Sequence, residues 1–379
     1  MKIFFSVGEP SGDLHAANLI RALRTRQPGV AITGLGGPRM AAAGAELLYP
    51  MTELAVMGIR RAVRHLPEFF RLADLAERHL RRHRPQALVL VDYPGFNLAL
   101  AQRAKRIGTP VYYFVPPQIW AWRRGRVRLV RKCCSAVLTA LPFEEKWYRS
   151  RGVNTYYVGH PYFDELARQQ LDPAFLSSQS RCGGTIVGLL PGSRDQEVAA
   201  NFEMMLNAAR KIRTAHRDVR FLVAAFNSRQ AEVARNFSAR AGFEVEVHVG
   251  RTPEIIELSQ VCVAVSGSVS LELMYRTKPS VIVYRMSPLA LWLARRLVKL
   301  PSFTLVNLLA GQSIFPEIAT SADESDQIAR LVLEWLEDPR SRAAKVAVIA
   351  ALRDRVVVPG ACDRAADFLL RQLATTSAA

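Results

Sequence analysis

Four residues near the middle of the chain combine a tight turn with a permanent positive charge. An apolar run at 186–190, typical of a strand, stops at Pro191, Gly192, Ser193 and Arg194, and a helical pattern follows. Proline and glycine let the backbone turn and approach a ligand closely, and a helix N-terminus directs free N–H groups at it. Arg194 adds a planar cation that matches phosphate geometry. The segment fits a phosphate or diphosphate, although an ordinary strand-to-helix turn with an exposed arginine has the same pattern.

A second loop of this kind follows a later apolar run. Its small residues are Ser266, Gly267, Ser268 and Ser270, whose hydroxyl and N–H groups can hold phosphate oxygens. Glu272, on the first turns of the next predicted helix, can accept both hydroxyl groups of a ribose. Serines that only cap the helix, with Glu272 completing a capping box, would explain the same residues. Because two such loops occur in one predicted sheet, the phosphate interpretation is favoured.

The first half of the chain has its own pair of polar loops after apolar runs. The first loop contains Glu9, Ser11, Gly12 and Asp13, and the second begins at Asp92 and ends at Asn97. Asp92 directly follows a fully apolar strand, where desolvation would raise its pKa toward that of a general base. The competing role for Asp92 is a helix N-cap.

Common nucleotide and metal motifs do not occur in these loops. Neither N-terminal loop matches G-x-G-x-x-G or G-x-x-x-x-G-K-[ST], so NAD and ATP are not expected. No D-x-D occurs in the chain, which argues against a carboxylate-held metal that bridges a diphosphate. The five cysteines lack C-x-x-C spacing, which argues against a zinc site or a disulfide framework and favours a reducing cytoplasm.

The chain is strongly basic and long enough for about two domains. Its 379 residues carry a formal net charge of +18, with 26 Lys and Arg against 13 Asp and Glu in residues 1–175. Polyanionic partners are expected, above all for the first half, although solvated arginine-rich helix faces explain part of the charge. No apolar run approaches the ~18 residues of a membrane span, and the apolar start lacks a signal-peptide cleavage site.

Short apolar runs alternate with amphipathic patterns throughout the chain. Strands are predicted at 3–7, 31–35, 87–91, 111–115, 137–139, 185–190, 221–225, 245–249, 261–265 and 281–284. Helices are predicted at 13–26, 66–83 and 98–107, from 195 onward, and through 326–373. A polar segment at 168–184 is interpreted as a linker. The pattern is typical of two doubly wound parallel α/β units, which bind ligands at the carboxyl ends of their strands.

Two basic stretches in the first half are rich in aromatic or apolar residues. The first has six cations after Trp120 and Trp122, namely Arg123, Arg124, Arg126, Arg128, Arg131 and Lys132. The second, at 56–72, mixes apolar side chains with arginines. Both patterns suit nucleic acid or a membrane interface. For 56–72, a buried helix with a solvated back is an equal alternative.

Nine short motifs occur in an order that resembles one enzyme family. They are V-G-E-P-S-G-D-L-H at 7–15, G-L-G-G-P-R-M at 34–40, M-G-I at 57–59, V-D-Y-P-G-F-N at 91–97, Y-Y-F-V-P-P-Q-I-W-A-W at 112–122, L-P-F-E at 141–144, V-G-H-P at 158–161, L-L-P-G-S-R at 189–194 and N-L-L-A-G at 307–311. The chain thereby resembles the lipid A disaccharide synthase family, glycosyltransferase family nineteen. The similarity spans residues 7–317.

The resemblance implies a GT-B fold, in which two Rossmann-like, doubly wound parallel-sheet domains face a cleft. Residues 1–170 would form the acceptor and membrane-facing domain, 171–345 the UDP-sugar domain, and 346–379 helices that pack back on the first domain. It implies an inverting transfer without a cofactor or metal. UDP-2,3-diacylglucosamine would be the donor and 2,3-diacylglucosamine 1-phosphate (lipid X) the acceptor, and lipid A disaccharide 1-phosphate and UDP the products.

The resemblance also implies roles for individual residues. Asp92 would deprotonate the 6-hydroxyl of the acceptor, directly or through Glu9 or His15. Further substrate contacts are expected from Ser11, Gly12, Asp13, Asn97 and Trp120 in the first domain, and from Pro191, Gly192, Ser193, Arg194, Gly267, Ser268, Ser270, Glu272, Asn307 and Glu317 in the second. The protein would lie on the cytoplasmic face of the inner membrane as a peripheral protein, and the sequence leaves open whether it forms a homodimer.

Two other interpretations of the sequence stay open. A UDP-N-acetylglucosamine 2-epimerase-like isomerase would share the two-domain fold and the UDP site. A nucleic-acid-binding protein would account for the net charge and the basic aromatic stretch, but it would leave the two phosphate-binding loops without a use.

Overall fold

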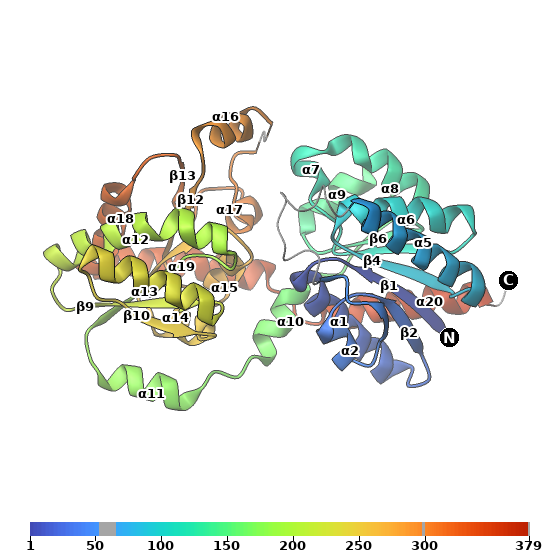
Figure 1. Ribbon diagram of the computed structural model, residues 1–379, viewed down its shortest axis with the longest axis horizontal. Coiled ribbons are helices and arrows are strands. Elements are labelled where there is room, and N and C mark those ends of the chain that lie inside the picture. The colour runs from blue at the N-terminus through green and yellow to red at the C-terminus, as the bar shows by residue number, and fades with distance from the viewer. Residues whose placement is uncertain (53–65, 298–299, 378–379) are drawn as a thin grey trace. The chain divides into compact units, whose positions relative to one another are not determined.

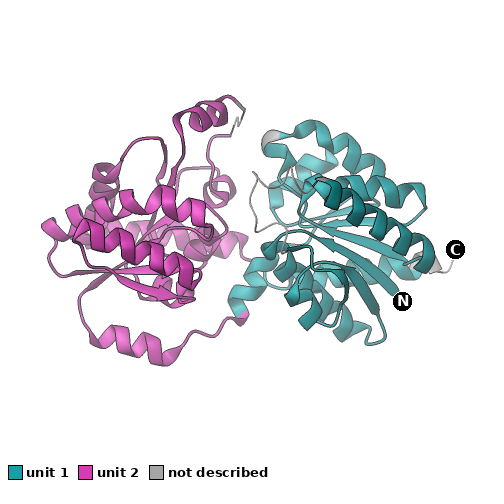
Figure 2. Ribbon diagram, viewed as in Figure 1, with its two compact units in different colours: residues 1–167, 358–379 teal, residues 168–357 magenta. Residues whose placement is uncertain are grey.

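The computed structural model describes residues 1–52, 66–297 and 300–377. The chain divides into two compact units, which are coloured separately in Figure 2. Unit 1 comprises residues 1–167 and 358–379, and unit 2 comprises residues 168–357. The M-G-I motif at 57–59 and most of the basic stretch at 56–72 lie outside the described residues.

Unit 1 is built on a seven-stranded parallel sheet in the order β3-β2-β1-β4-β5-β6-β7 (Figure 1). Its strands are β1 (Lys2–Val7), β2 (Ala31–Leu35), β3 (Glu46–Tyr49), β4 (Ala87–Val91), β5 (Val111–Phe114), β6 (Ala136–Thr139) and β7 (Thr155–Tyr157). Its helical segments are α1 (Pro10–Arg26), α2 (Pro38–Ala42), α5 (Leu66–His83), α6 (Pro94–Arg106), α7 (Ile119–Trp122), the 3-10 turn η1 (Arg124–Arg126), α8 (Val127–Cys133), α9 (Pro142–Arg149), α10 (Pro161–Arg168) and α20 (Ala361–Ser377).

Alternating side chains of the central strands fill two hydrophobic cores, one on each face of this sheet. Phe5 of β1 packs in one core with residues of α1 and α20, such as Leu369. Phe4 packs in the other core with residues of α5 and α6, such as Leu100. Because both faces are covered by helices, the strands are apolar on both sides, which is why they appear in the sequence as continuous apolar runs. Residues 346–357 belong to unit 2, and the chain returns to unit 1 at residue 358.

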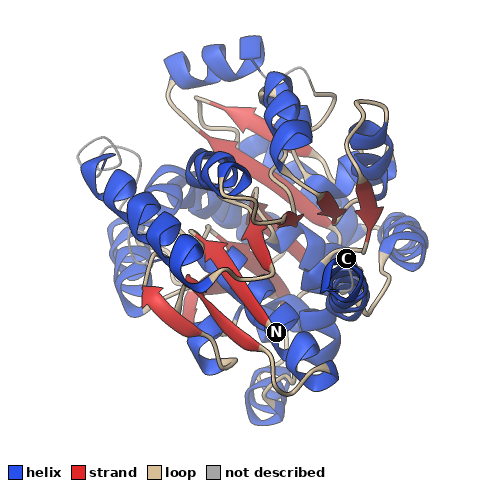
Figure 3. Cartoon of the chain, turned by 90° about the vertical axis from the view of Figure 1, so that its right-hand side faces the viewer, coloured by secondary structure: helices blue, strands red, loops and turns tan. Residues whose placement is uncertain are grey.

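Unit 2 contains a six-stranded parallel sheet in the order β10-β9-β8-β11-β12-β13. Its strands are β8 (Thr185–Leu190), β9 (Val219–Ala225), β10 (Glu246–Val249), β11 (Val261–Val265), β12 (Ser280–Arg285) and β13 (Glu317–Thr320). Its helices are α11 (Pro173–Arg181), α12 (Asp195–Ala215), α13 (Ser228–Ala241), α14 (Thr252–Leu258), α15 (Val269–Tyr275), α16 (Pro288–Leu297), α17 (Leu305–Ala310), α18 (Ser325–Glu337) and α19 (Pro339–Val356). Figure 3 shows the helices in blue and the strands in red.

The strand order has one point in each sheet where the direction of winding reverses. In unit 1 this point lies between β1 and β4, where Val7 pairs with Val91. In unit 2 it lies between β8 and β11, where Leu190 pairs with Ala264. Loops that leave such neighbouring strands in opposite directions open a crevice at the carboxyl edge of the sheet. The topology therefore brings the predicted loops together in two pairs, one pair in each unit.

The predicted architecture of two doubly wound parallel sheets is confirmed, with local corrections. The segment at 168–184, interpreted as a linker, contains the helix α11, whose N-cap Asp172 accepts hydrogen bonds from the amides of Ala174 and Phe175. Helices α1 and α6 begin earlier than predicted, at Pro10 and Pro94, because proline is favoured in the first helical turn. In the part of the chain that the structure describes, no helix is both long and apolar enough to cross a membrane.

Candidate active site

Asp92 lies at the carboxyl end of β4 in a constrained backbone conformation. It and Tyr93 both have left-handed φ angles, 45° and 48°. The side chain of Asn97 holds this bend, because its Nδ2 donates to the carbonyl oxygens of Val91 (3.1 Å) and Asp92 (2.8 Å). The hydroxyl of Tyr113 donates to the same Asp92 carbonyl at 2.7 Å. Asn97, predicted to contact substrate, is fully buried and instead fixes the direction in which Asp92 leaves the strand.

The carboxyl group of Asp92 is largely desolvated. Burial, and secondly the negative charge of Glu9, raise the pKa of Asp92 to about 7, while a hydrogen bond from the Tyr93 amide acts in the opposite direction. The rise confirms the direction expected from the position of Asp92 after an apolar strand. The N-cap alternative is wrong, because Tyr93 occupies the N-cap of α6 and makes no side-chain cap bond. A carboxyl with this pKa is half ionised near neutral pH and is suited to accept a proton.

The loop after β1 lies at the same sheet edge as Asp92. Gly8 is required there, because a Cβ atom at this position would lie 2.2 Å from the ring of Tyr93. Glu9 occupies the N-cap of α1 but makes no side-chain cap bond. In the first turn of α1, Ser11 is exposed and Gly12 is buried. Ser11 and Glu9 are thus the parts of this loop that are open to a ligand.

Asp13 has a structural role that the sequence did not indicate. Its buried carboxylate accepts hydrogen bonds from the amides of Gly37 (3.1 Å), Arg39 (3.0 Å) and Met40 (3.0 Å). These amides belong to the N-terminal end of α2, where carboxylates are favoured. Asp13, predicted to contact substrate, therefore uses both carboxylate oxygens to hold α2 against α1.

His15 lies on α1 beside a second histidine, His160, which precedes α10. The two rings meet edge to face with centroids 5.7 Å apart. Burial, followed by the charges of His160 and Arg39, lowers the pKa of His15 to about 3, and burial lowers the pKa of His160 to about 4. Among the described residues, no hydrogen-bond partner reaches Nδ1 of His15. Both rings are neutral at pH 7, so His15 offers a neutral imidazole and no positive charge.

Trp120 was predicted to contact substrate, but it is buried against a carboxyl group. Its indole Nε1 donates to Glu144 at 2.9 Å, and the amide of Leu141 donates to the other oxygen of Glu144 at 3.2 Å. Burial raises the pKa of Glu144 to about 7, and the charge of Asp92 contributes in the same direction. Glu144 appeared in the sequence only as the last residue of the L-P-F-E motif. Of the six cations after Trp122, all except the partly buried Arg126 are exposed.

In unit 2, the loop between β8 and α12 already holds an anion that belongs to the chain. One carboxylate oxygen of Glu197 accepts hydrogen bonds from the amides of Ser193 (3.1 Å) and Arg194 (3.2 Å). The other oxygen lies 2.8 Å from the Arg194 guanidinium. Gly192 has a φ of 111°, and a Cβ atom there would lie 2.6 Å from the Glu197 carboxylate. The buried Pro191 ends the strand, and Glu197 closes a capping box on Arg194, the N-cap residue of α12. This geometry fits both an anion-binding loop and the ordinary strand-to-helix turn with an exposed arginine.

Gln230, at the start of α13, also holds the loop between β8 and α12. No motif in the sequence predicted this contact. Gln230 is buried at the start of α13, and its Nε2 donates to the carbonyl of Ser193 at 2.9 Å. Its Oε1 accepts a hydrogen bond from the amide of Phe226 at 3.2 Å. Gln230 therefore joins the loops that follow β8 and β9. A single glutamine outside any motif gave no signal of this contact.

The second loop of unit 2 follows β11, directly beside the first. Gly267 and Ser268 are exposed, and the buried Ser270 donates its hydroxyl to the Gly267 carbonyl at 2.8 Å. Ser268 occupies the N-cap of α15 without a side-chain cap bond, so the capping-box alternative is not observed. Glu272 is buried and forms an ion pair with Arg276 at 3.2 Å. Arg276, the C-cap residue of α15, thus pairs with the carboxylate that was predicted to bind a ribose.

Asn307 and Glu317, predicted to lie near the donor sugar, form a compact network within unit 2. Glu317 accepts hydrogen bonds from Nδ2 of Asn307 (2.7 Å) and from the hydroxyl (2.6 Å) and amide (3.0 Å) of Thr304. Asn307 also accepts bonds from the amides of Ile314 and Phe315. The two side chains therefore fix the segment between α17 and β13. The side-chain oxygen and nitrogen atoms of Asn307 and Glu317 form these hydrogen bonds within unit 2.

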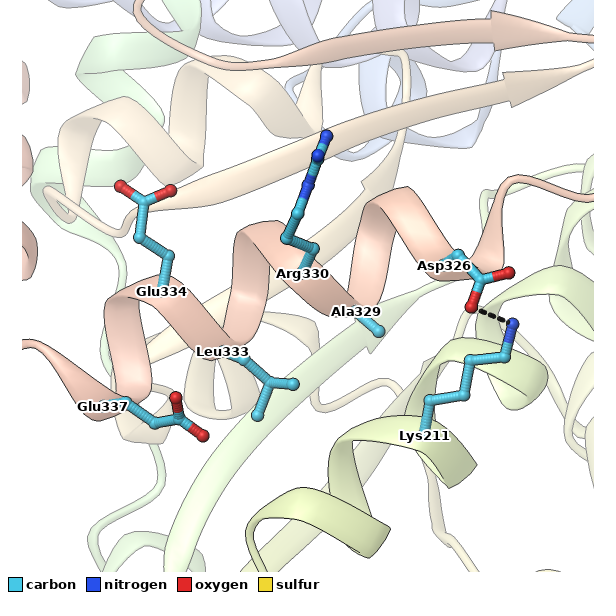
Figure 4. Close-up of a pocket in the computed structure, with 7 residues that line it drawn as sticks. All are labelled: Lys211, Asp326, Ala329, Arg330, Leu333, Glu334 and Glu337. Carbon is cyan, nitrogen blue, oxygen red and sulfur yellow. Dashed lines mark ion pairs between the residues drawn. The ribbon is translucent and has the colours of Figure 1, made fainter.

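Two hollows on the described surface lie away from these loops. One of about 670 Å³ lies between α12 and α18, where Lys211 and Asp326 form an ion pair of 2.6 Å (Figure 4). None of the residues that line it belongs to the four strand-end loops. Within the described ranges, no group of three or more His, Cys, Asp and Glu side chains is placed to hold a metal ion.

Sequence comparisons match nearly the whole chain to one group of enzymes. A family model described as lipid-A-disaccharide synthetase matches residues 3–368. A lipid-A-disaccharide synthase from Anaeromyxobacter sp. (strain K) is 35% identical over 370 residues, which cover 97% of each chain. A lipid-A-disaccharide synthase from Thiobacillus denitrificans is 39% identical over 349 residues, which cover 91% of this chain and 93% of the relative.

The fold is similar to that of solved structures with little sequence similarity. The crystal structure of UDP-GlcNAc 2-epimerase from Neisseria meningitidis bound to UDP-GlcNAc has a TM-score of 0.68, covering 98% of this chain and 100% of that chain. The sequences are 10% identical, so this similarity shows the fold alone. Together with the two parallel sheets, it confirms the expected GT-B fold of two Rossmann-like domains.

Proposed function

The chain belongs to the lipid-A-disaccharide synthetase family, and we propose that it joins UDP-2,3-diacylglucosamine to 2,3-diacylglucosamine 1-phosphate. It is a glycosyltransferase of lipid A biosynthesis. The products are lipid A disaccharide 1-phosphate and UDP. The match of residues 3–368 to the family is the observation that carries this proposal.

Unit 2 binds the donor in this proposal. The amides of Ser193 and Arg194 and the N-terminus of α12 face the diphosphate, with Arg194 as the cation. In support, these amides already bind the Glu197 carboxylate, and Gly267 and Ser268 are exposed in the neighbouring loop. Charge that develops on the leaving diphosphate is stabilised by fixed N–H dipoles and a guanidinium, so no metal ion is required.

Unit 1 supplies the base. Asp92 takes the proton of the acceptor 6-hydroxyl, and the oxygen then forms a bond to the anomeric carbon of the donor. The bond between this carbon and the diphosphate oxygen breaks, and UDP leaves with the electron pair from the opposite face, which inverts the configuration. The raised pKa of Asp92 supports this role, because it brings the proton affinity of the carboxyl close to that needed near neutral pH.

Acylated substrates require access to a membrane. We place the protein on the cytoplasmic face of the inner membrane, as a peripheral protein attracted to anionic lipid by its net charge of +18. A homodimer is compatible with this arrangement.

The proposal is tested by measuring UDP release from UDP-2,3-diacylglucosamine in detergent micelles, with and without lipid X and with and without EDTA. Release that requires lipid X and is unaffected by EDTA is the expected result. Asp92→Ala should abolish this release while the protein still binds UDP. Release that needs no acceptor, or turnover of unacylated UDP-N-acetylglucosamine, would instead assign the chain to the epimerase-like alternative.

A further inference from the structure

Helix α16 (Pro288–Leu297) exposes large apolar side chains to solvent. Leu289 is 74% exposed, Trp292 52% and Leu293 47%, all within five residues. Leu291, on the opposite side, is buried. Most other exposed large apolar residues of the described chain are isolated in sequence, such as Phe70 and Val348. Three such side chains on one short helix form a continuous apolar face that is exposed among the described residues.

The sequence that flanks this helix carries basic residues and no acidic ones, although Arg276 and Arg285 pair with glutamates from elsewhere in unit 2. The sequence contains no Asp or Glu between Glu272 and Glu317, while it contains Arg276, Lys278, Arg285, Arg295, Arg296 and Lys299. Arg295 and Arg296 are exposed in the last turn of α16. The Arg296 guanidinium lies over the Trp292 ring, 4.8 Å from its centroid. An apolar face with tryptophan and flanking arginines is typical of helices that lie in the headgroup region of a bilayer.

The helix is also connected to the donor-binding edge of unit 2. It follows β12 after only two residues, and residues 280–283 of β12 pair with β11. The carboxyl ends of β8, β11 and β12 lie at one edge of the parallel sheet, so α16 begins at the same edge as the loops at Ser193 and Ser268. Figure 1 shows α16 in orange at the periphery of this unit.

We propose that α16 is an interfacial helix that inserts Leu289, Trp292 and Leu293 into a bilayer containing anionic phospholipid. Arg295 and Arg296 contact lipid phosphates, and tryptophan occupies the boundary between headgroups and acyl chains. A second copy of the chain is a poorer occupant, because it would bring arginines against arginines. The proposal deepens the proposed function, in that it places the donor-binding edge of the sheet beside the layer that holds acylated substrate.

The test uses the full-length protein and vesicles of phosphatidylethanolamine and phosphatidylglycerol, with phosphatidylcholine vesicles for comparison. Wild-type protein should float with the anionic vesicles and bind phosphatidylcholine at least tenfold more weakly. Leu289→Ser combined with Leu293→Ser should reduce binding to anionic vesicles at least tenfold. Arg295→Gln combined with Arg296→Gln should reduce it several-fold and leave the apolar face intact. Val348→Ser, an exposed apolar residue of α19 in the same unit, is the matched control and should bind as wild type.

The fluorescence of Trp292 provides a second measurement, which reports insertion of the wild-type helix directly and does not depend on a variant that binds less. Its fluorescence should shift to shorter wavelength with anionic vesicles and be quenched by brominated lipid, and both effects should be absent in Trp292→Phe. Unchanged thermal unfolding and UDP binding establish that the variants are folded.

Three results would overturn the proposal. The first is that the Leu289/Leu293 variant binds anionic vesicles as well as wild type does. The second is that wild type binds both kinds of vesicle equally. The third is that Phe70→Ser in unit 1 loses binding while the α16 variants keep it. The vesicle assay contains no sugar substrate, so its failure leaves the transferase assay untouched. Conversely, absence of UDP release with intact vesicle binding would refute the proposed function and not the role of α16.

Discussion

Replacement of Asp92 by asparagine should stabilise the protein and abolish transfer. Asparagine fits the site, because it tolerates the left-handed backbone of this position better than most residues. Its side-chain oxygen can still accept the hydrogen bond from the Tyr93 amide. The variant therefore removes the charge and the proton-accepting function of Asp92, and keeps the local geometry.

The magnitude follows from the pKa of Asp92, which burial raises from 3.8 to about 7. A difference of about three pH units, at about 1.4 kcal/mol for each, amounts to up to about 4 kcal/mol of folding free energy. The sign is that of a group whose folded-state pKa is raised. At low pH the carboxyl is protonated in both states and costs nothing. As pH rises from 3.8 through 7, ionisation favours the unfolded chain, and the wild-type protein loses this free energy while the asparagine variant does not.

The assay is chemical denaturation of wild type and Asp92→Asn at a series of pH values. The variant should be more stable by about 2 kcal/mol at pH 5.5 and by up to about 4 kcal/mol at pH 8.5. UDP release in the presence of lipid X should be lost at every pH. A stability difference that stays constant between these pH values would refute the assigned burial of the carboxyl. Substantial transfer by the variant would refute its role as base.

Three further substitutions examine the neighbours of Asp92 and the donor loop. Glu9→Gln removes a negative charge that raises the pKa of Asp92, so the acidic limb of the pH profile for UDP release should move to lower pH; an unmoved limb would contradict the coupling. Arg194→Ala should weaken UDP binding roughly ten- to hundredfold, measured by calorimetry, as expected for loss of charge-assisted hydrogen bonds, with Arg194→Lys intermediate. Trp120→Phe leaves the buried Glu144 carboxyl without its indole donor and should lower the free energy of unfolding by about 1–3 kcal/mol. Trp120→Phe should lower the free energy of unfolding by less when Glu144 is already replaced by glutamine. An equal decrease in both backgrounds would show that packing of the tryptophan alone accounts for the effect.

The sequence predicted the central strands and the loops that follow them, because these signals are local. Apolar runs such as 87–91 are uninterrupted, and Pro and Gly follow close to the points at which they end. The edge strands β3, β7 and β13 were not predicted, since they are three or four residues long and partly exposed. Helix α11 was missed because its polar, serine-rich sequence is typical of a linker.

The roles of individual polar residues were harder to predict, because they depend on partners distant in sequence. The motif that contains Asp13 gave no sign that this carboxylate would bind the start of α2, 24 residues away. Asn97 and Asn307 were expected at the substrate, yet both hold backbone segments from buried positions. In these cases a motif identifies a residue that matters for the site. It does not show whether that residue contacts a ligand or supports another residue that does. The hydrogen-bond partners of each polar side chain, which only the structure shows, separate these two roles.

The two units use the same position in the fold for opposite electrostatic purposes. In unit 1, the sheet edge carries Asp92, whose pKa is raised by burial and by Glu9, and the charge of Asp92 in turn raises the pKa of Glu144, so negative charge is costly there and a proton is readily accepted. In unit 2, the corresponding edge offers amides and Arg194 to an anion, and Glu197 fills that place. If a diphosphate binds there, it exchanges one anion for another, so the loop amides have an acceptor before and after binding. In the proposed reaction, the loop after β8 would thereby be preorganised for the leaving diphosphate, and the desolvated Asp92 carboxylate would favour removal of a proton from the acceptor.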